Sequence, residues 1–394
     1  MKTFSLFLIV SILALKLFSQ PFNVGHTSLS FDDPARSNRS VSTEIYYPAL
    51  TTGDDVAVAN GAFPYIVFGH GFLMGASDYT NISDSLVSKG FIVIYVTTES
   101  TIFTSNHENY RLDLSFISGF FYYLNSNVSS MFYGKIIDKK AIMGHSMGGG
   151  CTVLAAQNNL NVNTIICLSP MGTTTPSAIS NADLVTVPAL IIGASGDSVC
   201  PANSMGIPIY DSLSSTCKVF LSIIGGGHCL FGNNSNGACS FGESSSGSTI
   251  TITSEQQNDV TLDFITNWLN FYLKDNISSR VLFFDSLQTS PRITYMSSCN
   301  TNEILQQANN KFNINYFIEN NNLQIGINNV IENNISIEIY NLLGQNQTCK
   351  FEKSYNKIEE SITGNINLSE IPSGMYILSI SDRNKTKGYK FIKK

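Results

Sequence analysis

Charged side chains are scarce in this chain of 394 residues. Asp, Glu, Lys and Arg make up 13% of it, whereas an average soluble protein contains about 25%. The 23 Lys and Arg residues are outnumbered by 29 Asp and Glu, which gives a formal net charge of -6. No cluster of basic residues lies on a recognisable binding motif. Because nucleic-acid binding depends on such a basic surface, we expect no nucleic-acid partner.

Long apolar runs are also missing after the N-terminus. Residues 4–15 are apolar apart from two serines, follow a basic start, and end at Lys16. That run is well short of the ~20 residues that cross a membrane. With Ser19 as a small residue for cleavage, residues 1–19 are predicted to be a removable signal peptide, and an N-terminal anchor is the alternative. We therefore expect a secreted protein, outside the cell or at its surface.

Aromatic side chains, by contrast, are plentiful: the chain has 25 Phe and 17 Tyr, and 43% of its residues are hydrophobic. A wholly disordered chain is excluded, because such chains are poor in aromatic residues and rich in charge. There is enough apolar material for a large core, and the length suggests about two or three domains.

Residues 20–277 alternate short buried strands with helical patterns. The strands are apolar and β-branched or aromatic, which is typical of parallel strands buried on both faces. This alternation predicts an α/β fold, in which helices cover both faces of a mostly parallel sheet. We expect an edge strand at residues 42–47, further strands at 65–68, 91–96, 140–143, 164–168, 189–192 and 218–224, and helices at 79–89, 112–124, 148–157 and 259–274.

The composition changes after residue 277. Residues 278–313 are predicted to be a linker. Residues 314–394 are rich in Asn and Ile, and short strands separated by turn residues replace the helical pattern. This part of the chain is therefore predicted to be a small all-β domain.

The strand at 140–143 runs directly into G-H-S-M-G at residues 144–148, and two more glycines follow before the next helix. A G-x-S-x-G sequence between a strand and a helix forms a tight turn that exposes its serine at the carboxyl edge of the sheet. We therefore expect Ser146 to be a nucleophile. The backbone N–H of Met147 is expected to face the developing oxyanion.

A serine nucleophile needs a base and a carboxylate that orients the base. His228 is the only histidine after Ser146, and it directly follows a predicted strand. Of the aspartates between them, Asp197 follows the strand at 189–192, whereas Asp183 precedes that strand and Asp211 lies in the next helix. Asp197 and His228 are therefore the expected acid and base, in the chain order of the α/β-hydrolases.

A second oxyanion donor is expected in the loop after the strand at 65–68. That loop reads G-H-G-F at residues 69–72, and the backbone N–H of Phe72 is the predicted donor. His70 precedes the serine and follows a different strand, so it is interpreted as structural support for the loop and not as the base.

These motifs resemble one group of α/β-hydrolases. Residues 24–275 are similar to cutinases, poly(ethylene terephthalate) hydrolases, chlorophyllase-like esterases and bacterial relatives of platelet-activating-factor acetylhydrolase. The likeness rests on D-D-P-A-R at residues 32–36, E-I-Y-Y-P at 44–48, and the G-H-S-M-G-G-G sequence at 144–150. It implies an α/β-hydrolase fold and a secreted serine esterase that acts on ester or polyester substrates without a metal or other cofactor.

Carried over residue by residue, the resemblance makes Ser146, Asp197 and His228 the catalytic triad. It also assigns substrate-binding roles to Phe72 and Met171. Phe72 stands where polyester-degrading members usually have Tyr. Met171, in L-S-P-M at residues 168–171, lies where they place a substrate-stacking Trp, so polyester activity is expected to be weak.

The C-terminal region resembles the sorting domain of the type IX secretion system. The motifs are N-L-L-G-Q at residues 341–345, L-S-E-I-P-S-G-M-Y at 368–376 and K-F-I-K-K at 390–394. The resemblance implies export across an outer membrane, with the type IX machinery as partner. A polymer-binding β-sandwich is the alternative, and no row of exposed aromatic residues supports it.

The chain contains eight cysteines. A disulfide bond between Cys229 and Cys239 would hold His228 in place, but Cys200 could pair with either of them instead. Cys151 and Cys167 are expected to be buried free thiols. No Cys/His spacing resembles a zinc site.

The same motifs fit two other functions. A small-ester esterase or lipase without polymer activity, and a non-catalytic binding protein of hydrolase fold, are the alternatives to a polyesterase. No large lid insertion interrupts the pattern, which favours an open cleft. The protein is expected to be a monomer.

Overall fold

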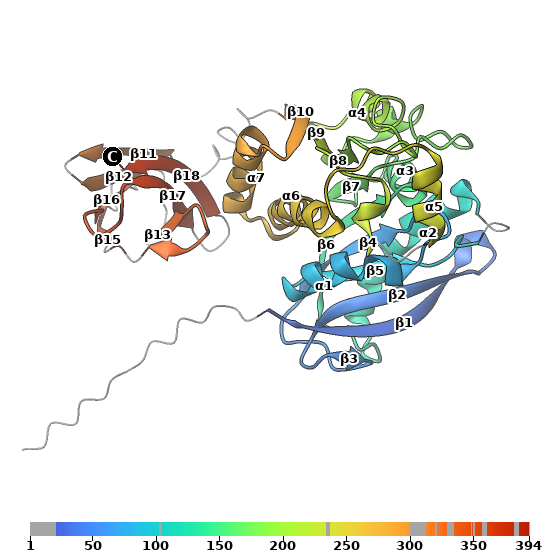
Figure 1. Ribbon diagram of the computed structural model, residues 1–394. Helices are drawn as coiled ribbons and strands as arrows, with labels where there is room; N and C mark the ends of the chain where they lie inside the picture. Colours follow the sequence, from blue (N-terminus) through green and yellow to red (C-terminus); the bar gives the residue numbers. More distant parts are fainter. Residues whose placement is uncertain are drawn as a thin grey trace, which may run out of the picture.

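The computed structural model describes residues 21–101, 105–233 and 237–299 and, further along the chain, residues 313–319, 321–328, 335–347, 349, 351–356, 361–381 and 386–393. The predicted signal peptide, residues 1–19, lies outside the described residues. Figure 1 shows a larger part in which strands and helices alternate and a smaller part built from strands. The predicted fold class is confirmed.

A ten-stranded sheet forms the centre of the larger part. Its strands are β1 (Asn23–Asp33), β2 (Arg39–Ala49), β3 (Gly53–Asp54), β4 (Phe63–Gly69), β5 (Ile92–Val96), β6 (Ile136–His145), β7 (Thr164–Leu168), β8 (Ala189–Ala194), β9 (Cys217–Ile223) and β10 (Ile293–Cys299). The strands follow the order β10-β9-β8-β7-β6-β4-β5-β2-β1-β3. Neighbours from β9 to β5 are parallel, and β10, β2 and β1 are each joined antiparallel. The carboxyl ends of the parallel strands therefore meet at one edge of the sheet.

Helices cover both faces of this sheet. They are α1 (Thr80–Ser88), α2 (His107–Phe120), α3 (Met147–Ala155), α4 (Gly206–Ser212), α6 (Ser254–Lys274) and α7 (Ile277–Thr289). Side chains of α2, α3 and α4 join the core on one face, and side chains of α1, α6 and α7 join the core on the other. On α2, the buried residues Tyr110, Leu114 and Ile117 recur every three or four positions, which places them on one side of the helix. Among the described residues no helix is long and apolar enough to span a membrane.

The prediction of an edge strand at residues 42–47 is wrong. These residues lie within β2, which pairs with β5 on one side and with β1 on the other. The strand β1 escapes prediction because its inward-facing positions include Gly25, Thr27 and Asp33 as well as Phe31. Its hydrophobic alternation is therefore weak, although its backbone pairs with β2 along its whole length.

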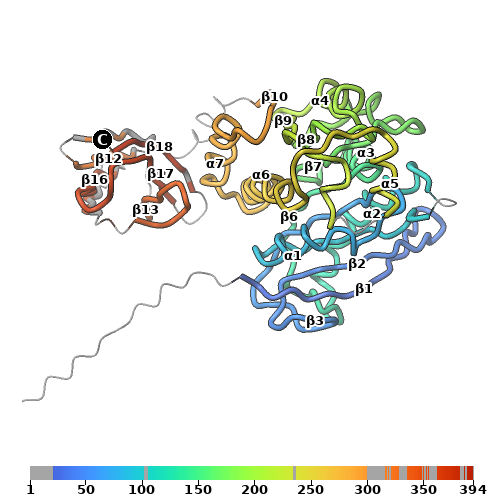
Figure 2. The backbone as a smooth tube through the Cα atoms, in the orientation of Figure 1, coloured from blue at the N-terminus to red at the C-terminus, as the bar shows by residue number. Residues whose placement is uncertain are grey.

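The predicted linker, residues 278–313, is wrong over its first part. Residues 277–299 form α7 and β10, and β10 pairs antiparallel with β9 along all seven of its residues. A disulfide bond joins Cys217 to Cys299 across this pair, and Phe283 and Leu287 of α7 are buried against the core that α6 helps to form. Figure 2 shows the chain passing from α6 through α7 to β10 beside β9. Residues 300–312 lie outside the described part of the chain.

The smaller part contains two four-stranded antiparallel sheets, with the orders β11-β12-β16-β15 and β14-β13-β17-β18. Their strands are β11 (Asn313–Glu319), β12 (Asn322–Asn328), β13 (Ser336–Asn341), β14 (Asn346–Gln347), β15 (Phe351–Asn356), β16 (Ser361–Asn367), β17 (Gly374–Ser381) and β18 (Thr386–Lys393). Alternate residues such as Leu323, Ile325 and Ile362 of the first sheet and Ile339 and Leu378 of the second belong to one apolar core. The all-β character predicted from the short apolar strands is confirmed.

Candidate active site

Ser146 occupies the turn between β6 and α3. Its backbone has a φ of 55°, a left-handed conformation that is strained for a residue with a side chain. The turn requires glycine on either side, because a Cβ atom at Gly144 would overlap the carbonyl oxygen of Gly148, and one at Gly148 would overlap that of Gly69. The strand, the helix and the neighbouring loop can therefore approach closely enough to present the serine hydroxyl at the edge of the sheet.

The structure brings Ser146, His228 and Asp197 together from three different loops. The Oγ of Ser146 lies 3.0 Å from Nε2 of His228, and Nδ1 of His228 lies 2.8 Å from Oδ2 of Asp197. The exposed fractions of the three residues are 9%, 3% and 6%, respectively. Because a carboxylate only accepts hydrogen bonds, Nδ1 of His228 carries a proton, which leaves Nε2 free to accept the proton of the serine hydroxyl.

Asp197 is held in its ionised form. Its Oδ1 accepts hydrogen bonds from the backbone N–H groups of Val199 and Cys200, at 2.9 and 2.8 Å. Burial alone would raise the pKa of this carboxyl, but the hydrogen bond and charge of His228 and the N–H of Cys200 together hold its pKa below the usual value. A carboxylate beside His228 favours the imidazolium form that arises when the histidine accepts a proton.

The loop after β4 faces the same turn. The backbone N–H of His70 donates to the hydroxyl of Tyr110 over 2.7 Å, and that of Gly71 donates to the hydroxyl of Tyr79 over 2.9 Å. The ring of His70 is buried, with its nitrogens 2.8 and 2.9 Å from the carbonyl oxygens of Gly71 and Thr98. These contacts agree with a supporting role for His70.

Two backbone N–H groups remain for an incoming oxygen. Within the described ranges, the N–H groups of Phe72 and Met147 donate to no other group. Both residues therefore keep the donor that the sequence assigns to them. Their role as an oxyanion hole stays a prediction.

The two residues with predicted substrate-binding roles differ in exposure. The side chain of Phe72 is 46% exposed. The side chain of Met171 is half-buried and packs against the core, while its backbone N–H donates to the carbonyl oxygen of Ser146 over 2.9 Å. Met171 is thus fixed beside the nucleophile through its backbone, and its contact with substrate stays a prediction.

Two side chains, from Gln257 and His145, bond to the backbone of the loop that carries His228. No sequence pattern predicts either contact. Gln257 of α6 accepts a hydrogen bond from the N–H of Gly227 and donates one to its carbonyl oxygen, each at 2.8 Å. Nε2 of His145 lies 3.0 Å from the carbonyl oxygen of His228. His145 lies inside the G-H-S-M-G sequence, and Gln257 lies 30 residues beyond the loop. Neither spacing marks the residue as a partner of His228.

The structure contains a disulfide bond between Cys229 and Cys239. Cys200, the alternative partner, is a buried free thiol, as are Cys151 and Cys167. Burial raises the pKa of Cys200 to about 12, and the charge of Asp197 adds to that effect. A thiol with so high a pKa is a poor nucleophile at neutral pH.

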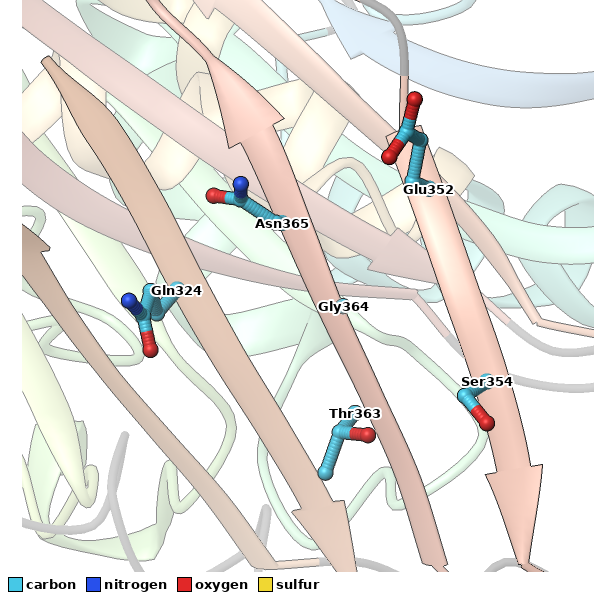
Figure 3. Close-up of a pocket in the computed structure, with 6 residues that line it drawn as sticks. All are labelled: Gln324, Glu352, Ser354, Thr363, Gly364 and Asn365. Atoms are coloured by element: carbon cyan, nitrogen blue, oxygen red, sulfur yellow. The ribbon is translucent and has the colours of Figure 1, made fainter.

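A separate depression of about 470 Å³ lies on the β-rich part of the chain. Figure 3 shows its lining side chains on three neighbouring strands, with Gln324 on β12, the residues 363–365 on β16, and Glu352 and Ser354 on β15. None of these six lining residues is aromatic. The depression therefore offers no stacking surface, which disfavours a polymer-binding role for this face.

The fold and the site together define a class of protein. A serine on a strained turn after a parallel strand, with histidine and aspartate supplied by later strand ends, is the arrangement of the α/β-hydrolases. The chain belongs to the PET hydrolase-like family, whose model matches residues 14–244. A second model, the secretion system C-terminal sorting domain, matches residues 308–394. The two resemblances seen in the sequence are thereby confirmed, and the sorting domain marks a protein of the cell exterior or surface.

Named relatives agree with this family. The chain is 30% identical over 207 residues to a bis(hydroxyethyl) terephthalate hydrolase from Streptomyces coelicolor, which covers 52% of this chain and 59% of the relative. It is 30% identical over 181 residues to a cutinase from Thermobifida alba, covering 45% and 55% of the two chains. A cutinase from Thermobifida cellulosilytica is 27% identical over 216 residues, covering 54% and 74%. The chain thus spans a little over half the length of the first two relatives.

Proposed function

We propose that this chain is a secreted serine esterase that hydrolyses carboxylic esters through an acyl-enzyme on Ser146. The observation that carries the proposal is the hydrogen-bonded series from the Ser146 hydroxyl through His228 to Asp197, with distances of 3.0 and 2.8 Å. A hydroxyl becomes a useful nucleophile when a base lies within hydrogen-bond reach and a carboxylate orients that base. The relatives, named as cutinases and as a terephthalate ester hydrolase, support an ester substrate.

The first half of the reaction forms the acyl-enzyme. Nε2 of His228 takes the proton from Ser146 as Oγ attacks the ester carbonyl carbon, and the carbonyl oxygen becomes an oxyanion. The imidazolium then gives this proton to the departing alcohol. Asp197 stays ionised and favours the imidazolium throughout.

The second half releases the acid. Water loses a proton to Nε2 of His228 and attacks the acyl carbon, and the oxyanion forms again. Collapse of this intermediate returns the proton to Oγ of Ser146 and frees the carboxylic acid. The N–H groups of Phe72 and Met147 are the proposed donors to the oxyanion, and removing one such donor typically costs about 3–4 kcal/mol of transition-state stabilisation.

For the substrate class, we propose short acyl esters together with weak activity on aromatic polyesters. The exposed ring of Phe72 offers an apolar face beside the proposed oxyanion hole. Met171, which is bonded to the backbone of Ser146, supplies no aromatic face, so a polymer chain would have one stacking contact fewer. A small-ester esterase without polymer activity is the second candidate, and the half-buried side chain of Met171 favours it.

We further propose that the β-rich domain, residues 314–394, directs export through the type IX machinery. The sorting-domain match to residues 308–394 supports this assignment. The proposed catalytic residues all precede Cys229, so none lies in the β-rich domain. The protein is proposed to act as a monomer. A truncated chain that ends before residue 313 should keep esterase activity but stay in the periplasm of its host.

The decisive experiment measures turnover of p-nitrophenyl esters with increasing acyl length, together with labelling by a fluorophosphonate. Ester turnover and a mass increase on the peptide that contains Ser146 are expected. A folded protein that neither turns over these esters nor takes the label would be a non-catalytic binding protein, and the proposal would be wrong.

A further inference from the structure

The segment after His228 contains a helix that no sequence motif predicts. Helix α5 (Gly237–Ser245) carries Cys239 and Glu243 four residues apart, a spacing that puts both on one face of a helix. Cys239 is bonded covalently to Cys229. Glu243 is buried, with an exposed fraction of 6%, although a carboxylate is seldom buried without a partner.

Glu243 bonds to the backbone of the loop that carries His228, which is called the histidine loop below. Its Oε1 accepts a hydrogen bond from the N–H of His228 and a second, at 3.3 Å, from the N–H of Cys229. The approach depends on Gly227, because a Cβ atom there would lie 2.6 Å from the same carboxylate oxygen. The carboxylate therefore holds residues 228 and 229, and the disulfide bond holds residue 229, both from one side of α5.

The short 3-10 helix η5 (Cys229–Phe231) begins directly after His228, and side chains bond to the backbone just before it. The N–H and carbonyl of Gly227 both bond to Gln257, and the carbonyl of His228 bonds to His145. The N–H of His228 bonds to Glu243. Side chains from α5, α6 and the end of β6 thus all bond to the backbone of residues 227 and 228, and Glu243 is the one among them that carries a charge.

We propose that Glu243 is a positioning residue for the reaction, holding the backbone of His228 so that Nε2 stays within reach of Ser146, and placing a second negative charge near the imidazolium. This inference deepens the proposed esterase function and rests on it. The hydrogen bonds of Glu243 go to the backbone N–H groups of His228 and Cys229, so it acts through the backbone of His228.

The charge of Glu243 faces two titratable groups, His228 and Asp197. Burial raises the pKa of Glu243, while the N–H groups of Cys229 and His228 and the charge of His228 lower it, and the charge of Asp197 raises it further. Because the attraction between Glu243 and a protonated His228 is mutual, the carboxylate favours the imidazolium. Removing its charge should therefore extend activity to lower pH.

The test compares Glu243→Ala and Glu243→Gln in the full chain, with p-nitrophenyl butyrate as substrate. The Ala variant should lose roughly 10- to 100-fold in kcat with KM changed less than about threefold, since a displacement of about 1 Å can cost on the order of 10²-fold. The Gln variant should recover most of kcat, because its amide oxygen can accept the same two N–H groups. In the Gln variant the acid limb of the kcat/KM profile should move to lower pH.

Two controls separate this role from general stability. Glu255→Gln removes one negative charge from an exposed position of α6, and Ser244→Ala changes an exposed residue of α5; both should match the wild type in kcat and pH profile. A third variant, in which Cys229 and Cys239 are both replaced by Ser, should lower kcat as Glu243→Ala does. Thermal unfolding of each variant checks that the assayed protein is folded.

Three results would overturn the proposal: an Ala variant with kcat within about threefold of the wild type, a loss that Gln does not recover, or an acid limb that stays in place in both variants. If the wild type hydrolyses no ester, the proposed function fails instead. The titration of the His228 ring, followed by NMR in the wild type and the Gln variant, would still test Glu243: the midpoint should be lower in the variant, and equal midpoints would refute it.

Discussion

The rings of His145 and His228 lie against each other with centroids 4.7 Å apart, and Nε2 of His145 donates a hydrogen bond to the carbonyl oxygen of His228. Burial, aided by the charge of His228, holds the pKa of His145 well below its usual value. The ring is therefore neutral, and because Nε2 faces a carbonyl oxygen, Nδ1 is the acceptor. The hydroxyl of Tyr79 lies 2.8 Å from Nδ1 and also accepts the N–H of Gly71. One buried series of hydrogen bonds thus links the proposed oxyanion loop to the histidine loop.

Tyr79→Phe tests this link. The change leaves the N–H of Gly71 and Nδ1 of His145 without partners, and each unsatisfied buried group costs about 1–3 kcal/mol. We expect lower stability and a fall of about three- to tenfold in kcat/KM on p-nitrophenyl butyrate, because Phe72 directly follows Gly71. Tyr95→Phe is the matched control: it removes a buried hydroxyl that donates to the carbonyl oxygen of Tyr79, so it should lower stability but spare turnover. Equal effects on turnover would contradict the link.

Ser146→Ala should leave a folded protein with ester hydrolysis reduced by several orders of magnitude, because nucleophile, base and acid act as one unit. Asp197→Asn should be severe but less complete, since it disturbs the tautomer of His228 and keeps the nucleophile. Turnover of p-nitrophenyl butyrate and the thermal unfolding midpoint are measured together. A Ser146→Ala variant with more than about a tenth of wild-type turnover would exclude the proposed mechanism.

The second disulfide bond, Cys217–Cys299, is expected to act on stability alone. It closes a span of 82 residues, and a crosslink of that size contributes on the order of 2–4 kcal/mol, mainly by restricting the unfolded chain. Cys217 lies at the start of β9, whereas the His228 loop follows the end of that strand. Replacing both cysteines by Ser should therefore lower the free energy of unfolding in urea by about this amount and leave kcat within about twofold. A fall in kcat of clearly more than twofold would refute the assignment.

Local chain geometry explains which parts of the fold and site could be predicted. Ser146, Asp197 and His228 each follow a buried apolar strand, and parallel strands put their carboxyl ends at one edge, so sequence order alone indicates that they meet. The glycines on either side of Ser146 add a steric requirement that is visible in the sequence. These signals lie within a few residues of each other in the sequence. The strands from β4 to β9 are predictable for the same reason, since each contains a short apolar run.

Other features depend on contacts that leave no local pattern. Glu243 lies 15 residues after His228 in a segment rich in Gly, Asn and Ser, and its partners are backbone N–H groups, which every residue except proline has. The Cys217–Cys299 pairing joins distant segments, and cysteine positions by themselves allow many pairings. The pairing of β1 with β2 is carried by the backbone, so the polar residues of β1 conceal it.

His26 gives a pH dependence whose sign can be stated. Burial would lower its pKa, but hydrogen bonds and charges from Asp54 and Glu44, at 2.8 and 2.7 Å, raise it above the ordinary value. A histidine with a raised folded-state pKa contributes stability below its unfolded pKa and loses that contribution as pH rises through the folded one. The destabilisation caused by His26→Ala, measured in urea, should therefore be larger at about pH 5.5 than at about pH 9. An equal destabilisation at both values would contradict the expectation.

Met171→Trp addresses the substrate. Each aromatic stacking contact adds roughly 0.5–1.5 kcal/mol beyond the buried area, and about 1.4 kcal/mol changes a rate tenfold. Because Met171 is fixed beside Ser146 by its backbone N–H, we expect a ring at this position to stack on a bound polymer chain. We expect the variant to release aromatic acids from amorphous poly(ethylene terephthalate) about two- to twelve-fold faster than the wild type, with a smaller change on p-nitrophenyl butyrate. Met171→Leu keeps the apolar volume without the ring and should give no such gain. If Leu matches Trp, or if both substrates gain equally, stacking at this position does not limit polymer hydrolysis.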